Sequence, residues 1–282
     1  MKKREIIEGV IKDYDFPNKG SFELDGKKVI VKGALPGQKV SCMVSKVRKD
    51  KAEARLLDVL ERSEIEDAVP PCPQFGICGG CAYQTMSYEH QLELKAGQVK
   101  KLLDGVIDSE AHPYEWEGII GSPVTTAYRN KMEYSFGDEY KDGPLVLGLH
   151  KKNSMYDIVP VCNCVIVSED YNRIVSYTME FARAHGLSYH KKMQHVGLLR
   201  HLVLRQSKTN GGLLVNLVTS TDGLENLDLK AYVEGLLALP LDGTIVGILH
   251  TANDSLADAV VPEKVTLLYG RDYIEEEVLG LH

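Results

Sequence analysis

Residues 72–81 read Cys-Pro-Gln-Phe-Gly-Ile-Cys-Gly-Gly-Cys, and this stretch is the most informative in the chain. Cys78 and Cys81 are separated by two glycines, so the backbone is free to wrap around a single centre that both thiolates bind. Cys72 can reach the same centre across a loop. Three thiolates leave a four-coordinate metal or a cubane cluster one ligand short, so a distant fourth ligand is expected. The candidates for it are Cys162 and Cys164.

The uneven spacing of these thiols favours an iron–sulfur cluster over zinc. Zinc sites usually combine two short spacings or add histidines, and only one short pair is present here. Six cysteines in 282 residues are too few for a disulfide scaffold. Zinc and unliganded cysteines are the alternatives. Cys42 lies within a predicted strand, where we expect a small buried hydrophobe.

The first 62 residues form a basic module that the total charge conceals. The whole chain has a net charge of −7, but residues 1–62 carry 15 Lys and Arg against 10 Asp and Glu. Positive charge gathered on one small module indicates phosphate binding, with solvated surface charge as the alternative. The predicted RNA-binding residues of this module are Lys27, Lys28, Lys32, Lys39, Lys46, Arg48, Lys49 and Lys51.

Alternating apolar residues predict five short strands in this module. The predicted strands span residues 5–14, 21–24, 27–32, 39–49 and 52–60. Asp25-Gly26 is a two-residue hairpin signal. These features predict a small OB-like β-barrel, a fold that commonly offers a face for nucleic acid. Tyr14, Phe16 and Phe22 near its turns are candidates for stacking on bases, with core packing as the alternative.

The pattern of apolar residues in the remainder of the chain predicts a mixed α+β fold. Helices are predicted at 85–106, 168–185 and 224–239, the first with Ser87 as its N-cap and an apolar face of Leu92, Val99, Leu102, Leu103 and Val106. Strands are predicted at 129–136, 145–150, 155–161, 199–206, 213–219, 244–250, 264–269 and 273–279.

We therefore expect three parts: a barrel at 1–62, a linker and cysteine loop at 63–84, and an α+β domain at 85–282. No apolar run approaches the roughly 20 residues that cross a membrane, and the first residues lack the apolar stretch of a secretory signal. These features predict a cytoplasmic protein without a membrane partner, and we expect a monomer.

Several segments together resemble the RNA uracil-5-methyltransferases, in particular the 23S ribosomal RNA branch with a TRAM domain and an iron–sulfur cluster. Residues 33–40, Gly-Ala-Leu-Pro-Gly-Gln-Lys-Val, resemble the TRAM segment, and residues 72–81 resemble the cluster loop. Tyr-Arg-Asn-Lys-Met at 128–132 and the segments at 199–205 and 269–274 resemble later parts of the family. The resemblance covers essentially the whole chain.

The resemblance implies a four-iron four-sulfur cluster held by Cys72, Cys78, Cys81 and Cys162. Cys162 is preferred because the family's ligand follows a strand with a lead-in like residues 158–161, and Cys164 is the alternative. The implied reaction is methyl transfer from S-adenosylmethionine to C5 of a uracil in RNA, with 23S ribosomal RNA as the expected partner. In this reaction a cysteine thiolate attacks C6, a base removes the C5 proton, and the target base is unstacked. The candidates for RNA contacts nearer the target are Arg129, Lys131, Arg200 and Arg205.

The chain shows no glycine-rich turn between a strand and a helix at which S-adenosylmethionine could bind. The resemblance implies that a Rossmann-like domain would supply this site and the catalytic Cys and Glu. We therefore predict that the chain is the RNA-binding and iron–sulfur portion of the enzyme, truncated before the catalytic domain and inactive alone. The alternatives are a stand-alone RNA-binding adaptor with a structural metal centre, a relative of the tRNA uracil-5-methyltransferases, and an electron-transfer protein.

Overall fold

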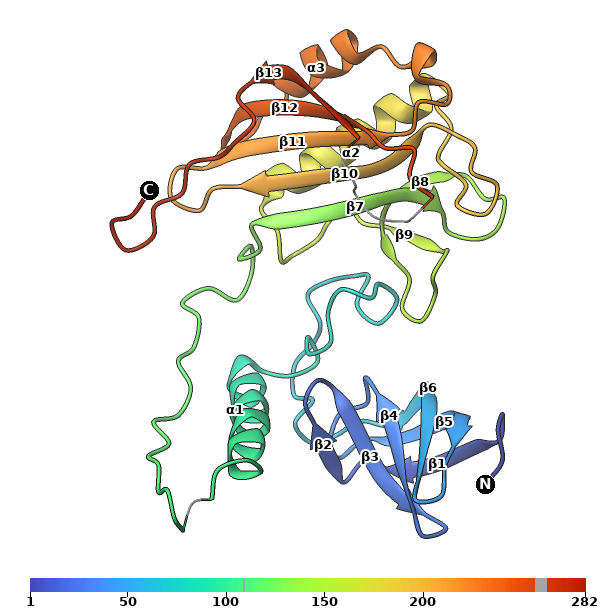
Figure 1. The fold of residues 1–282 in the computed structure, drawn as a ribbon, viewed down its shortest axis with the longest axis vertical. Coiled ribbons are helices and arrows are strands. Elements are labelled where there is room, and N and C mark those ends of the chain that lie inside the picture. The colour runs from blue at the N-terminus through green and yellow to red at the C-terminus, as the bar shows by residue number, and fades with distance from the viewer. Residues whose placement is uncertain (109, 257–262) are drawn as a thin grey trace. The chain divides into compact units, whose positions relative to one another are not determined.

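The chain folds into two compact units in a computed structural model that describes residues 1–108, 110–256 and 263–282 (Figure 1). The first unit comprises Met1–Pro70 and Ala82–Pro123, and the second comprises Pro71–Cys81 and Val124–His282. This division differs from the predicted boundaries. The helix after the cysteine loop belongs to the barrel unit, and the cysteine loop itself belongs to the α+β unit.

The first unit is built on a six-stranded sheet in the order β1-β5-β6-β4-β3-β2. All neighbouring strands are antiparallel except β4 and β6, which are parallel. The strands are β1 (Ile6–Val10), β2 (Asp13–Asp15), β3 (Lys19–Leu24), β4 (Lys27–Lys32), β5 (Lys39–Val47) and β6 (Lys51–Glu61). The predicted strand at 27–32 is confirmed. The predicted strand at 5–14 is two strands, because the N–H of Ile11 turns to the carbonyl of Gln38 at 2.8 Å.

The sheet of the first unit curls back on itself around an apolar interior. Gly9 of β1 lies so close to the ring of Phe22 in β3 that a side chain at position 9 would overlap it. Val29 and Val31 of β4 are fully buried in this interior, as the alternating pattern predicts. Cys42 of β5 is also fully buried there.

Helix α1 (Tyr88–Asp104) begins at the predicted cap, where the Ser87 hydroxyl accepts a hydrogen bond from the N–H of His90. The predicted apolar face does not make a core, however. Val99 and Leu102 remain 43% and 52% exposed, and Gln98 is the buried residue of the helix. Polar contacts tie the helix to its unit instead, with the Lys101 ammonium 2.5 Å from the Asp15 carboxylate.

The second unit is a seven-stranded sheet in the order β13-β12-β11-β10-β7-β8-β9, with helices α2 (Glu169–Ala184) and α3 (Leu229–Leu237) behind it (Figure 1). β11 and β12 are parallel, and the other neighbours are antiparallel. The strands are β7 (Lys131–Asp138), β8 (Leu145–His150), β9 (Ile158–Pro160), β10 (Leu199–Gln206), β11 (Gly212–Thr219), β12 (Thr244–Ala252) and β13 (Lys264–Gly270). The predicted strands at 145–150 and 199–206 are confirmed.

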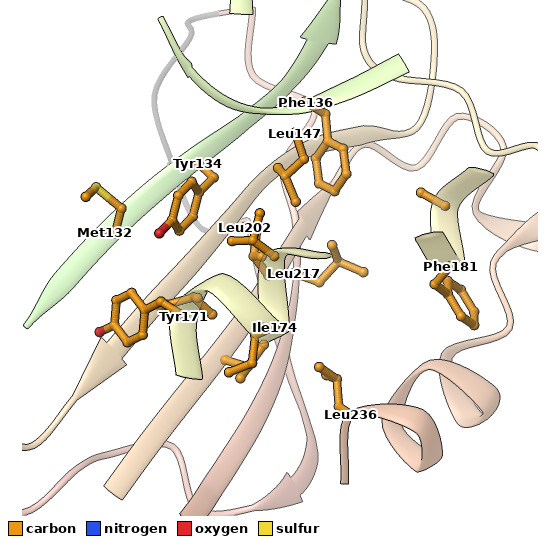
Figure 2. Close-up of a cluster of buried hydrophobic side chains, with 14 of the residues drawn as sticks. Met132, Tyr134, Phe136, Leu147, Tyr171, Ile174, Phe181, Leu202, Leu217 and Leu236 are labelled. Carbon is orange, nitrogen blue, oxygen red and sulfur yellow. The ribbon is translucent and has the colours of Figure 1, made fainter. Parts of the chain in front are cut away.

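The core of the second unit lies between this sheet and its two helices. Tyr134 of β7 and Leu202 of β10 point from the sheet toward Ile174 of α2, and all three are fully buried (Figure 2). Leu236 of α3 closes the same cluster. Within the described ranges, no helix is long and apolar enough to cross a membrane.

Two predicted elements of the second unit differ in the structure. The helix predicted at 224–239 is a 3₁₀ turn, η1 (Leu224–Asn226), followed by α3, because the Asp228 carboxylate caps a new helix by accepting the N–H of Ala231 at 2.9 Å. The segment 273–279 is not a strand. Its Glu276 carboxylate instead accepts the N–H groups of Lys208 and Thr209, at 2.8 and 3.0 Å.

Asp170 is a buried charge that joins α2 to the segment before β12. Its side chain is 1% exposed, and its two carboxylate oxygens accept the N–H groups of Asp242 and Gly243, each at 2.8 Å. Arg173 lies 3.6 Å from the same carboxylate. The interaction fixes the entry to β12.

We expect Asp170→Ala to lower the free energy of unfolding by about 2–4 kcal/mol, because two backbone donors lose their acceptor. Urea denaturation followed by circular dichroism measures this change. Glu180→Ala, an exposed change in the same helix, is the control and should stay within about 0.5 kcal/mol of the wild type. A loss below 1 kcal/mol for Asp170→Ala would contradict this role.

Candidate cysteine centre and basic face

The cysteine loop is held on the second unit by main-chain hydrogen bonds to the end of β8. The N–H of Gly79 donates to the carbonyl of His150 at 3.0 Å, and the N–H of Lys152 donates to the carbonyl of Ile77 at 2.7 Å. Cys78 and Lys151 thus form an antiparallel bridge. The loop therefore adds one bridge at the end of β8, and this pairing fixes where Cys78 lies.

The glycines of this loop do not have the backbone conformation that the sequence suggests. The positive φ lies at Gly76, at 85°, and not at the two glycines between Cys78 and Cys81. Gly79 is required instead for close approach, because a Cβ there would lie 3.3 Å from the carbonyl oxygen of His150. The amide of Gly80 points back to the Cys78 sulfur at 3.4 Å.

The two late cysteines differ in burial: Cys164 is buried and Cys162 is exposed. Burial raises the pKa of the Cys164 thiol, and Cys81, Cys72 and Cys78 raise it further. The Asn172 side chain of α2 fixes the backbone of Cys164 by accepting its N–H at 3.0 Å. Residues 161–164 turn after β9, and this turn buries the second cysteine of the pair. The burial favours Cys164, the alternative fourth ligand, over the preferred Cys162.

The Tyr-Arg-Asn-Lys segment lies beside the same centre. The N–H of Arg129 donates to the carbonyl of Ile166 at 2.9 Å, in the turn just after Cys164. Burial raises the pKa of Tyr128, and the charge of Cys81 raises it further. The positive charge of Arg129 opposes both effects. Three segments that are far apart in the sequence therefore converge on one set of thiols.

A single metal ion and a cluster place different demands on the spacing of these thiols. Among the described residues, no group of three or more His, Cys, Asp or Glu side chains is close enough to hold a metal ion. Zinc–sulfur bonds of about 2.3 Å would draw four thiolates to within roughly 4 Å of one another. An iron–sulfur cluster binds each thiolate through a different iron and so accepts a wider spacing.

The hydroxyl of Tyr134 provides a second indication of a group at this centre. Tyr134 is fully buried in the core that contains Cys164, and in the described chain its hydroxyl has no hydrogen-bond partner (Figure 2). Burial raises the pKa of Tyr134, with a further contribution from Cys164, so the hydroxyl keeps its proton and can donate a hydrogen bond. An orphaned buried donor is costly, and a sulfur acceptor would satisfy it. The sequence could have indicated this residue, because Tyr134 alternates with Met132 and Phe136 on the core-facing side of a predicted strand.

The ten predicted RNA-binding residues divide into three groups. Four of the ten are engaged within the protein: Lys28 with Asp15 at 3.1 Å, Lys39 with Glu61 at 2.9 Å, Lys131 with Glu133 at 3.6 Å, and Lys27 with the carbonyl of Arg48 at 3.1 Å. Lys46, Arg48, Lys49 and Lys51 lie around the β5–β6 turn with exposed side chains. The remaining two are Lys32, which is exposed on β4, and Arg129, which lies at the cysteine centre.

Three further candidates are buried. The guanidinium of Arg200 is buried and donates to the carbonyls of Asn253 and Ser255, at 2.7 and 2.8 Å. Tyr14 and Phe22 are buried in the first unit. Phe16, by contrast, is 55% exposed. Of the three aromatic candidates, Phe16 has the exposed ring that stacking on a base requires.

No protein-family model matches this chain. The chain is 45% identical over its full length to an uncharacterized RNA methyltransferase of Clostridium acetobutylicum and 44% identical to one of Caldanaerobacter subterraneus subsp. tengcongensis. It covers 60% and 61% of those proteins, so it spans about three fifths of the length of the curated relatives it matches.

A solved structure shares the fold. The tRNA (uracil-54, C5)-methyltransferase of Pyrococcus abyssi, in complex with S-adenosyl-L-homocysteine, aligns with a TM-score of 0.65 at 24% identity. The alignment covers 96% of this chain and 57% of that one.

These similarities correct the prediction of a truncated, inactive chain. That prediction inferred loss of function and an absent catalytic domain from where the sequence ends. The similarity to proteins named RNA methyltransferases extends over every residue of the chain, and 96% of it shares the fold of a methyltransferase solved with S-adenosyl-L-homocysteine. The end of the chain is therefore no evidence that the protein is inactive.

Proposed function

We propose that the native protein is an RNA methyltransferase of the cytoplasm that modifies C5 of a uracil. The observation that carries this proposal is the 45% identity over the whole chain to a protein named as an RNA methyltransferase. The choice of uracil C5 is supported by the fold shared with a tRNA (uracil-54, C5)-methyltransferase. The same fold favours a relative of the tRNA enzymes over the 23S ribosomal RNA branch.

In this proposal the first unit is a TRAM-like module that binds the RNA backbone. S-adenosylmethionine would supply the methyl group. Lys46, Arg48, Lys49 and Lys51 are placed at one turn with exposed side chains, where they can neutralise phosphates. Arg129 instead lies near Tyr128 and Tyr134, where its positive charge opposes the rise in their pKa values.

We further propose that Cys72, Cys78, Cys81 and Cys164 hold a four-iron four-sulfur cluster. The electrostatic contact of Cys164 with the three loop thiols supports this set over one with Cys162. Arg129 and the Tyr134 hydroxyl supply a cation and a donor for its negative sulfurs. The cluster would fasten the cysteine loop to the sheet edge and to the start of α2, which makes its role structural.

We expect Cys164→Ser to lose most of its iron and sulfide after anaerobic purification, because one of four ligands is removed. Cys162→Ser, two residues away and exposed, is the matched control and should keep the wild-type iron content and visible absorption. Metal analysis by mass spectrometry measures both variants. Equal loss in the two variants, or zinc in place of iron, would contradict the proposed centre.

We expect the native protein to transfer a labelled methyl group from S-adenosylmethionine to unmodified tRNA. Digestion of the RNA and nucleoside mass spectrometry should give 5-methyluridine. Ribosomal RNA transcripts are the comparison substrate. A methylated base other than uracil, or methylation at a position other than C5, would overturn the proposal.

A further inference from the structure

Three cations stand directly opposite one another across three strands of the first unit. Lys19 of β3 pairs with Lys32 of β4 in the antiparallel register, and Lys32 pairs with Arg55 of β6 in the parallel register. We call Lys19, Lys32 and Arg55 the cationic row. It crosses β3, β4 and β6, which are neighbours in the sheet order.

The cationic row faces outward. Val29 and Val31 are fully buried, so strand alternation places Lys32 on the outer face of β4. Residues directly opposite in a sheet share a face, so Lys19 and Arg55 lie on the outer face too. Neighbouring strands are about 4.8 Å apart, and the row therefore spans roughly 10 Å.

This arrangement is unfavourable for the isolated fold. Like charges directly opposite each other destabilise a sheet. Among the described residues, no ion pair is recorded for Lys19, Lys32 or Arg55. Asp15 lies opposite Lys19 but is taken by Lys101 and Lys28, at 2.5 and 3.1 Å, and these contacts hold the pKa of Asp15 below its usual range. The row therefore keeps its positive charge.

The cationic row differs in charge from the two rows that follow it on the same face of the sheet. The next row consists of Ser21, which is buried, Ile30 and Glu53. The row after that consists of Glu23, Lys28 and Lys51, and its Lys28 is bound to Asp15 at 3.1 Å. The cationic row is therefore the one of these three rows in which every position is a cation, and a phosphate backbone can follow that line of charge.

An exposed aromatic ring lies at the end of this line. Phe16 is in the turn that joins β2 to β3, three residues before Lys19, and it is 55% exposed. The turn is well anchored: the Asn18 side chain accepts hydrogen bonds from the hydroxyls of Tyr14 and Tyr83. The Asn18 carbonyl accepts the N–H of Gly33 at 2.9 Å. The ring is thus presented to solvent on a fixed support.

We propose that the cationic row and Phe16 form a binding site for a single-stranded RNA segment. The three cations bind phosphates, and one unpaired base stacks on Phe16. A cationic line with an aromatic ring is the combination that recognises single strands, because stacking on a side chain needs an exposed base face. This site deepens the proposed function and depends on RNA being the substrate.

The test compares variants in binding to a fluorescently labelled single-stranded oligoribonucleotide, measured by anisotropy over a range of salt concentrations. Lys19→Gln, Lys32→Gln and Arg55→Gln are combined in one row variant. The matched control combines Lys3→Gln, Lys141→Gln and Lys230→Gln, which removes the same charge from scattered positions outside the row. We expect the row variant to bind at least tenfold more weakly and to lose roughly 2 from the slope of log affinity against log salt.

Phe16→Ala separates stacking from charge. It should weaken binding about tenfold and leave the salt slope unchanged, because stacking releases no counterions. The row variant should be at least as resistant to urea as the wild type, because a like-charge repulsion is removed. This second measurement excludes misfolding as the cause of weaker binding.

The outcomes distinguish this site from the proposed function. If the wild type binds no RNA, both fail. If the wild type binds RNA and the row variant matches the scattered control, the site is wrong and the proposed function stands. If an RNA duplex of equal length binds as tightly as the single strand, and Phe16→Ala has no effect, the assignment to single strands is wrong.

Discussion

The pairing of the cysteine loop with the end of β8 is the contact on which the arrangement of the second unit's site depends. Two main-chain hydrogen bonds, from Gly79 to His150 and from Lys152 to Ile77, hold the loop at the sheet edge. They place Cys72, Cys78 and Cys81 near Cys164, whose own backbone is fixed by Asn172 of α2. The chain passes from the first unit into the eleven residues Pro71–Cys81, returns to the first unit at Ala82, and enters the second unit again at Val124.

Charge is the second constraint, and it acts locally in both units. In the first unit, Lys19, Lys32 and Arg55 are aligned despite their repulsion, while the nearest carboxylate is occupied by other lysines. In the second unit, the positive charge of Arg129 acts on Tyr128, and Asp170 satisfies two buried backbone donors. The net charge of −7 conceals these local arrangements.

Short strands rich in Val, Ile and Leu could be predicted from the sequence, whether one face is buried, as at 27–32, or nearly every residue is, as at 199–206. The strands at 27–32, 145–150 and 199–206 have the predicted bounds. The segment 273–279 alternates as well, but its Glu276 binds the turn at Lys208 and Thr209 instead of joining a sheet. The apolar residues of α1 stay exposed because polar contacts, such as Lys101 with Asp15, hold that helix.

The candidate site could be predicted only in part. The loop thiols were evident from spacing, but the choice between Cys162 and Cys164 depends on how the chain turns after β9. The unpartnered hydroxyl of Tyr134 can be recognised only when its burial is known. The cationic row can be recognised only when the strand register is known. A sequence gives neither. The inference of an inactive chain failed for a different reason, since it depended on where the sequence ends.

The central proposal is that the cysteine loop, the turn at Cys164 and the segment from Tyr128 to Tyr134 meet at one iron–sulfur centre. Anomalous diffraction at the iron absorption edge, from anaerobically grown crystals, tests it most directly. The account predicts a single strong iron peak enclosed by the sulfurs of Cys72, Cys78, Cys81 and Cys164, with the Tyr134 hydroxyl facing it. An iron peak at Cys162, or a peak at the zinc edge alone, would contradict it.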